Sequence, residues 1–371
     1  MARTRDQDAC PGALQVHRAA DGALARVRLP GGMIAPAQLE ALAHAATRFG
    51  SPAMELTSRG NVQIRGITDT RALADAIAAA GLLPSPTHER VRNIVASPLS
   101  GRLGGTADVR ELVRQLDAAI CDEPVLAELP GRFWVGIDDG RGDVSGLAPD
   151  LGAHALADSF AVLLAGRDTG VRIAPDCVVA TLVSVAQRFA DIREDTWRVA
   201  ELADPSTLIS GLPRAAAPGT TWPPVSRPPV GWISQDDGRV ALGAAVPLGV
   251  LQARVAEYLA AIEAPIIITP WRSVLVCDLE DGVADAALRV LAPMGLVFDE
   301  NSPWLDVSAC TGSPGCQHSA ADVRADAAKA VGEHSSVRRH FVGCERACGS
   351  PSSGEVLIAT GDGYVLRTTS P

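Results

Sequence analysis

Two similar stretches in different halves of the chain determine the predicted fold. The first reads RVRLPGGMIAPAQLEALAHAATRFGSPAMELTSRGNVQIRGI (residues 26–67), and the second reads RVALGAAVPLGVLQARVAEYLAAIEAPIIITPWRSVLVCDL (residues 239–279). Each predicts a strand, a turn, an amphipathic helix, a strand that contains a Thr and a further strand. An offset of 212 residues aligns the following pairs: Gly31 with Gly243, Leu39 with Leu251, Thr57 with Thr269, and Val62 with Val274.

The segments that follow the two stretches also resemble each other. Helices are predicted over 69–80 and 281–292, after which ADVRELV (107–113) matches ADVRADA (321–327), and Phe133 matches Phe341. The shared order indicates two copies of one module. A further helix is predicted over 176–194, and the proline-rich segment 203–232 is predicted to be a surface linker. The pattern favours an α+β fold with small mixed sheets and helices on one face.

Composition excludes some classes of partner. The chain has 371 residues, of which 47% are hydrophobic, so it can form more than one buried core. Its net charge of −10 argues against a nucleic-acid partner. Neither a targeting segment nor a long apolar run is evident, so we expect a cytoplasmic protein with no membrane partner.

Four cysteines form two pairs near the end of the chain. CTGSPGC holds Cys310 and Cys316, and CERAC holds Cys344 and Cys348. In a cytosolic chain, paired cysteines indicate metal binding, either to zinc or to an iron–sulfur cluster. Five residues within the first pair are many for a structural zinc site, whereas a cubane cluster needs ligands that are spread more widely.

The local sequence around these cysteines favours the cluster. Gly312 and Gly315 predict a tight loop whose amides can face sulfide, close to the start of a helix predicted from Asp322. CERAC is predicted to form one helical turn. The remaining cysteines stand alone and are predicted to be buried thiols, although Cys10 stands out beside Pro11 and Gly12: Cys10, Cys121, Cys177 and Cys277.

The spacing Cx5C, 27 residues, then Cx3C resembles the cluster signature of the sulfite and nitrite reductase superfamily. Members pair a [4Fe-4S] cluster with a sirohaem-type tetrapyrrole, and in the reductases the cysteine that corresponds to Cys348 bridges cluster and haem iron. The resemblance implies duplicated ferredoxin-like half-domains plus two mixed αβ domains of the reductase type, related by a pseudo-two-fold repeat. The implied boundaries are 20–82, 88–202, 203–232 (linker), 233–298 and 302–371, the last with the cluster.

A second motif is ELTSRGNVQIRGI (residues 55–67). If it forms a strand, four polar side chains share one face, opposite Val62 and Ile64: Arg59, Asn61, Gln63 and Arg65. A solvated face explains the pattern on its own. The resemblance instead implies contacts with the acetate and propionate groups of a tetrapyrrole, and it extends this role to Arg92 and Asn93. Arg132 opens a run in which the reductases have a basic residue on each side of Phe, and Trp134 replaces the second.

Two kinds of superfamily member compete. One is a sirohaem-dependent sulfite or nitrite reductase. The other is the precorrin-3B synthase class, which the short chain, the opening DACPGALQVHRAADGALARVRLPGG (8–32) and a single lysine, Lys329, favour. That class implies precorrin-3A and O2 as substrates, hydroxylation with lactone formation, and electrons from a reductase or NADH.

The synthase class also implies a mononuclear non-haem iron, with sirohaem present only in the reductase alternative. The seven histidines show no recognisable facial-triad spacing, so neither the ligands of this iron nor a catalytic residue can be assigned; His318 follows the cluster loop. A third hypothesis, an electron carrier or sensor with a cluster, does not account for the arginine-rich motif.

Overall fold

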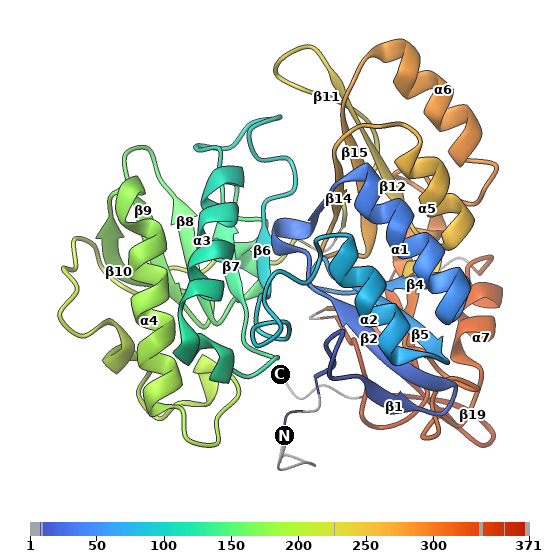
Figure 1. Cartoon of the computed structure of the whole chain (residues 1–371), viewed down its shortest axis with the longest axis horizontal. Helices are drawn as coiled ribbons and strands as arrows, with labels where there is room; N and C mark the ends of the chain where they lie inside the picture. Colours follow the sequence, from blue (N-terminus) through green and yellow to red (C-terminus); the bar gives the residue numbers. More distant parts are fainter. Residues whose placement is uncertain (1–7, 9, 226, 334–336, 352, 368–371) are drawn as a thin grey trace.

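The computed structural model describes residues 8, 10–225, 227–333, 337–351 and 353–367. Its α+β class agrees with the prediction, and Figure 1 shows a first αβ unit (green) beside a larger body made from the remaining segments. None of the helices among the described residues is long and apolar enough to cross a membrane.

The first ferredoxin-like half is an antiparallel sheet with two helices. Its helix α2 begins after Asp69, whose carboxylate accepts a hydrogen bond from the amide of Ala72, and Gly81 follows its end with a φ of 72°. The elements are β1 (His17–Ala19), β2 (Gly22–Val27), β3 (Met33–Ile34), α1 (Pro36–Phe49), β4 (Ala53–Leu56), β5 (Val62–Ile67) and α2 (Thr70–Ala79).

The second ferredoxin-like half repeats this order. It contains β11 (Gly231–Ser234), β12 (Val240–Ala245), β13 (Val250–Gln252), α5 (Ala253–Ala260), β14 (Ile266–Ile268), β15 (Ser273–Leu279) and α6 (Asp281–Leu291). The two halves exchange one strand each: the sheets have the orders β1-β2-β5-β4-β13 and β11-β12-β15-β14-β3. Each copy therefore completes the sheet of the other.

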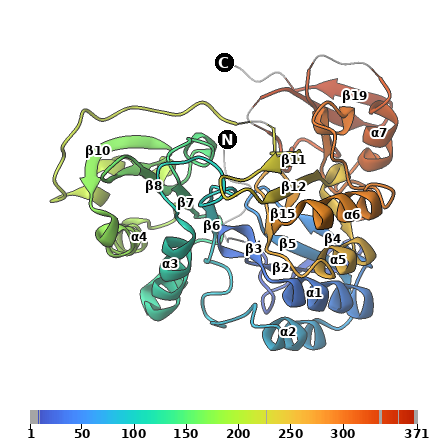
Figure 2. The same cartoon turned by 90° about the horizontal axis from the view of Figure 1, so that it is seen from above.

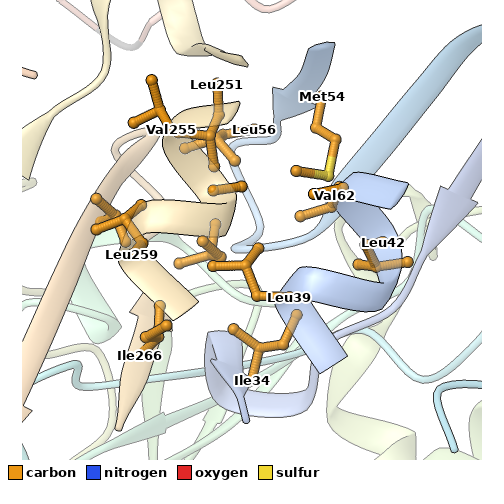
Figure 3. Close-up of a cluster of buried hydrophobic side chains, with 14 of the residues drawn as sticks. Ile34, Leu39, Leu42, Met54, Leu56, Val62, Leu251, Val255, Leu259 and Ile266 are labelled. Carbon is orange, nitrogen blue, oxygen red and sulfur yellow. The ribbon is translucent and has the colours of Figure 1, made fainter. Parts of the chain in front are cut away.

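The two halves also share one hydrophobic core. Helix α1 packs against both α2 and α5, and Figure 3 shows Leu39 of α1 between the two helices beside Leu259 of α5, with Leu42 and Val255 in the same core. All four side chains are at most 5% exposed. Burying a leucine-sized side chain contributes about 1.5–3 kcal/mol, so this interface stabilises both copies together.

The single offset of 212 residues is wrong for the first part of the repeat. Pro30–Gly32 and Pro247–Gly249 form equivalent turns, so Gly31 corresponds to Leu248 and not to Gly243; both have a left-handed backbone, with φ of 64° and 54°. Leu39 likewise does not match Leu251, because Leu39 lies in helix α1 whereas Leu251 lies in strand β13. The later matches hold: Thr57 with Thr269, and Val62 with Val274.

The two αβ units share a strand pattern. The first has the sheet order β10-β9-β8-β7-β6, and the second has β16-β17-β18-β19. In the first unit β6 pairs with β7, and β7 with β8, in parallel, and β8 pairs with β9 antiparallel. In the second unit β16, β17, β18 and β19 repeat this pattern of two parallel pairings and one antiparallel pairing. The first unit contains β6 (Ile94–Ala96), α3 (Arg110–Asp122), β7 (Val135–Asp138), β8 (Leu151–Ala155), β9 (Phe160–Leu164), β10 (Arg167–Ile173) and α4 (Val178–Ile192).

The second αβ unit is smaller and contains the paired cysteines. Its elements are β16 (Val307–Ala309), α7 (Val323–Ala330), β17 (Arg339–Val342), β18 (Glu355–Thr360) and β19 (Gly363–Leu366). Figure 2 shows the connecting segment, residues 203–225 and 227–230, as a long and mostly irregular connection between the first αβ unit and β11. The predicted linker reached residue 232, but β11 already begins at Gly231.

Candidate functional site

The fold brings the four paired cysteines together at the ends of β16 and β17. Cys310 directly follows β16, and Cys344 comes two residues after β17. The amide of Gly343 donates to the sulfur of Cys310 at 3.3 Å, and the amide of Cys310 donates to the carbonyl of Phe341 at 2.9 Å. Burial, together with the neighbouring thiols of the other three cysteines, raises the pKa of Cys348.

Tight turns shape both cysteine segments. The amide of Cys316 donates to the carbonyl of Gly312 at 2.8 Å, which closes the predicted loop. A Cβ on Gly312 would lie 2.6 Å from the side chain of Val323, the first residue of α7, so this loop abuts the helix N-terminus as expected. A Cβ on Gly343 would lie 1.8 Å from Ser319 Oγ, so only glycine permits this approach of the two segments.

The predicted helical turn at CERAC is wrong. The amide of Ala347 donates to the carbonyl of Cys344 at 3.1 Å, but Ala347 has a φ of 48° and Gly349 a φ of 76°. The segment is therefore an irregular turn that reverses direction at Ala347. Left-handed backbone at a non-glycine residue costs free energy, which surrounding contacts must offset.

The sulfur positions fit a cluster better than one ion. Within the described chain, a single group of three or more potential ligand atoms lies within 4.8 Å of one another, and it consists of Asp138, Asp139 and Asp143. The four sulfurs are therefore spread more widely than the ligands of one tetrahedral zinc ion. Four thiols at this wider spacing, with glycine amides beside them, suit a [4Fe-4S] cluster.

A buried histidine supports the second cysteine segment. His340 on β17 is fully buried, and its Nε2 lies 3.0 Å from the carbonyl oxygen of Cys348. That carbonyl can only accept, so Nε2 carries the proton, and Nδ1 accepts from the hydroxyl of Ser308 at 2.8 Å. Burial lowers the pKa of His340 to about 4, so the ring is neutral at pH 7.

A cluster of arginines lies where the first ferredoxin-like half meets the first αβ unit. Arg59 Nη1 donates to the carbonyl of Gly131 at 3.3 Å, and burial, followed by the charge of Arg198, lowers the pKa of Arg59 to about 10. The charge of Arg26 also lowers the pKa of Arg59, and burial, together with the charges of Arg26 and Arg59, lowers the pKa of Arg28 to about 9. We call Arg26, Arg28, Arg59 and Arg198 the arginine cluster. Such crowding of cations favours an anionic ligand.

The arginine-rich motif is not one continuous strand, which corrects the prediction. Arg59 and Asn61 lie in the turn between β4 and β5, and only Gln63 and Arg65 lie on β5. These two do share a face opposite the buried Val62 and Ile64.

Gln63 and Arg65 make contacts within the protein. Gln63 accepts from Arg26 Nε at 2.9 Å and donates to Glu55 at 3.1 Å. Arg65 donates to Asp21 at 2.9 Å and to the carbonyl of Gly315, in the first cysteine loop, at 2.7 Å. One face of the sheet therefore connects the arginine cluster to the cysteine segments.

Three other predicted contact residues are held inside the protein. Asn61 accepts from the amide of Leu29 at 2.9 Å and donates to Asn93, which itself donates to the carbonyls of Gly131 and Phe133. Both amides are 1% exposed. Arg92 forms a two-point ion pair with Asp117 of α3 at 2.7 Å. These side chains position the Gly131 segment, and we do not assign them to direct ligand contact.

Arg132 is exposed, and its guanidinium lies 4.9 Å from the ring centroid of Trp197, next to Arg198. Trp134, in contrast, is 6% exposed and packs in the interior. Arg26, Arg28 and Arg198 are site residues that the sequence motifs did not indicate. The alternation of Arg26 and Arg28 in RVRLPGG could have indicated the first two, because β2 pairs directly with β5.

Sequence and structure comparisons identify relatives. Residues 16–80 match the family described as the nitrite/sulfite reductase ferredoxin-like half domain. A precorrin-3B synthase from Sinorhizobium sp is 27% identical over 96% of this chain and 82% of its own length. A ferredoxin–nitrite reductase from Synechococcus elongatus is 24% identical over 90% of this chain and 75% of its own.

The fold itself also matches a solved structure. The Mycobacterium tuberculosis NirA protein has a TM-score of 0.77 over 93% of this chain and 73% of its own, at 20% identity. At that identity the likeness concerns the fold.

Proposed function

We propose that this chain, which belongs to the superfamily of sulfite and nitrite reductases, acts as a precorrin-3B synthase. It would hydroxylate precorrin-3A with O2 and form a lactone, with Cys310, Cys316, Cys344 and Cys348 holding a [4Fe-4S] cluster. When bound, the cluster would supply electrons one at a time. The electron donor would be a partner reductase or NADH.

The arginine cluster is the observation that carries this proposal. Arg28 is 2% exposed, and its Nη1 has no hydrogen-bond partner within the described part of the chain, although the group is charged at neutral pH. A buried cation with a free N–H is costly unless an acceptor meets it. The carboxylates of a precorrin are such acceptors, and guanidinium groups bind them through two parallel hydrogen bonds. Arg59 and the exposed Arg132 extend the same cationic surface.

The proton donors support the synthase over the reductase. Reduction of sulfite or nitrite consumes several protons, and arginine is a poor acid because its pKa is ordinarily above ~12. Although burial lowers the pKa of Arg28 to about 9 and that of Arg59 to about 10, both groups stay charged at pH 7. The single lysine, Lys329, lies on the exposed side of α7, where its Nζ is 3.3 Å from Asp326. Trp134 is buried at the position where the reductases have a second basic residue.

In this proposal each group of residues has a defined role. The arginine cluster binds and orients the substrate carboxylates, and Asn61 and Asn93 fix the Gly131 segment that contacts Arg59. Gln63 and Arg65 connect this region to the cysteine loop. We retain as proposals a mononuclear non-haem iron, whose ligands we do not assign, and the domain boundaries given above.

The absorption spectrum of anaerobically purified protein tests the proposal. An iron–sulfur spectrum with acid-labile sulfide and without sirohaem bands is expected. Cys344→Ser should abolish this spectrum, whereas Cys177→Ser, which changes an exposed cysteine outside the paired set, should leave it intact. Sirohaem bands beside the cluster would favour the reductase alternative and contradict the synthase. Failure to bind iron and sulfide after anaerobic reconstitution would contradict both.

A further inference from the structure

We propose that Cys10 is a reactive thiol that a hydroperoxide oxidises to a sulfenic acid, which Arg26 and Arg28 then hold. The sulfur of Cys10 lies 3.1 Å from Nη1 of Arg26 and 3.4 Å from Nη2 of Arg28. Its own hydrogen is directed to the carbonyl of Gly131 at 3.2 Å. Cys10 is half-buried, so a small oxidant can reach it. Reactive cysteines occupy electropositive, partly exposed sites of this kind.

Arg28, which contacts the Cys10 sulfur, also has a donor that is not satisfied within the described residues. Its Nε and Nη2 donate to the carbonyl of Arg90, and Nη2 also donates to the carbonyl of Pro11 at 3.2 Å. Among the residues that the structure describes, Nη1 of the same buried guanidinium has no hydrogen-bond partner. Burial lowers the pKa of Arg28 to about 9, which reflects the unfavourable burial of its charge. Nη2 of the same guanidinium contacts the Cys10 sulfur at 3.4 Å, so an oxygen added to that sulfur would carry an acceptor to this guanidinium group.

The backbone holds Cys10 in place against the two arginines. The carboxylate of Glu89, which is 4% exposed, accepts hydrogen bonds from the amides of Ala13, Leu14 and Gln15 at 2.5 to 2.9 Å. A Cβ on Gly12 would lie 2.4 Å from Glu89 Cδ, so the turn after Cys10 requires glycine. These contacts fix the turn that directly follows Cys10.

The oxidation step balances as follows. The sulfur attacks one oxygen of hydrogen peroxide, an S–O bond forms and the O–O bond breaks, and the thiol proton leaves with the departing hydroxide as water. The sulfur loses two electrons and the peroxide gains them. The new oxygen would accept hydrogen bonds from guanidinium groups of the arginine cluster. The oxidised sulfur would then compete with substrate carboxylates for these guanidinium groups. This competition rests on the proposed function, whereas the oxidation of Cys10 does not.

The test compares two thiols in the same full-length protein. As-isolated protein is treated with limiting hydrogen peroxide and a metal chelator in the presence of dimedone, and mass spectrometry follows labelling of Cys10 and of Cys177. Cys177 is the control because it is exposed and has no arginine hydrogen-bonded to its sulfur among the contacts of the described residues. We expect dimedone to label Cys10 about tenfold faster than Cys177. Dithiothreitol should reduce the sulfenic acid that dimedone has not yet trapped.

Variants of the two arginines assign the cause. Arg26→Gln and Arg28→Gln should slow labelling of Cys10 toward the rate of Cys177, and Arg26→Lys should restore part of it. Because Arg28 is buried and its variant can misfold, the comparison of Arg26→Gln with Arg26→Lys at the half-buried Arg26 is the decisive one. Labelling of Cys10 no faster than Cys177, or an unchanged rate in folded Arg26→Gln, would overturn the proposal.

Discussion

Replacing His340 with Phe should loosen the proposed cluster site without touching a cysteine. The neutral ring joins the Ser308 hydroxyl to the Cys348 carbonyl through contacts of 2.8 and 3.0 Å. Phe fills the fully buried space but leaves both groups without this partner. An unmet hydrogen-bonding group costs about 1–3 kcal/mol when buried. Loss of an outer contact of a metal ligand typically lowers metal affinity about 10–100-fold, and we expect an effect of that size.

The assay measures iron release from anaerobically reconstituted protein to a chelator, followed by the loss of cluster absorbance. His318→Phe is the matched control, because His318 follows the same cysteine loop but is exposed, and among the described residues its one hydrogen-bond partner is Gln317. His340→Gln keeps a donor for the carbonyl and should fall between wild type and His340→Phe. Equal release rates for wild type and His340→Phe would refute the reasoning, as would an equal effect of His318→Phe.

Three further predictions concern charge and ligands. Burial, followed by neighbouring carboxylates, raises the pKa of Asp143 to about 7, so the folded state binds a proton more tightly than the unfolded state and loses stability as the pH rises from about 4 to 7. Asp143→Asn keeps an acceptor for the Ser97 hydroxyl. In thermal melts this variant should be more stable than wild type by on the order of 2 kcal/mol near pH 8, and the difference should vanish near pH 4. A difference in stability that does not change with pH would contradict this prediction. Arg59→Ala should retain the cluster but bind a tetrapyrrole about 10–100-fold more weakly in a fluorescence titration; unchanged binding would remove Arg59 from the site. Cys344→Ser should lose iron and sulfide on analysis, and full retention would show that this thiol is not a ligand.

Local sequence patterns predicted much of the fold. The helix after Asp69, the strand alternation of Val62 and Ile64, and the repeat itself follow from capping residues and hydrophobic periodicity. The exchange of β3 and β13 between the halves could not be predicted, because a strand of two or three residues has no periodicity to read. The shift in the repeat offset was missed for a related reason: the shortening of α5 leaves its apolar pattern intact.

The candidate site was predicted less completely. The paired cysteines were evident from spacing, and the structure brings them together at the ends of equivalent strands. In the first αβ unit Ser97 follows β6 as Cys310 follows β16, and each accepts a hydrogen bond from the loop after the neighbouring strand. The part played by Arg26 and Arg28 depends on pairing between β2 and β5, and the confinement of Arg92 depends on Asp117, a contact distant in sequence.

The origin of the oxygen atom in the product is the most direct test of the proposed function. Reconstituted protein with an electron donor is given precorrin-3A and isotopically heavy O2, and the product mass is determined. We predict a hydroxylated lactone that carries one heavy oxygen atom, formed by wild type and not by Cys344→Ser. A product without heavy oxygen, or no turnover of precorrin-3A by protein whose cluster spectrum is intact, would contradict the account.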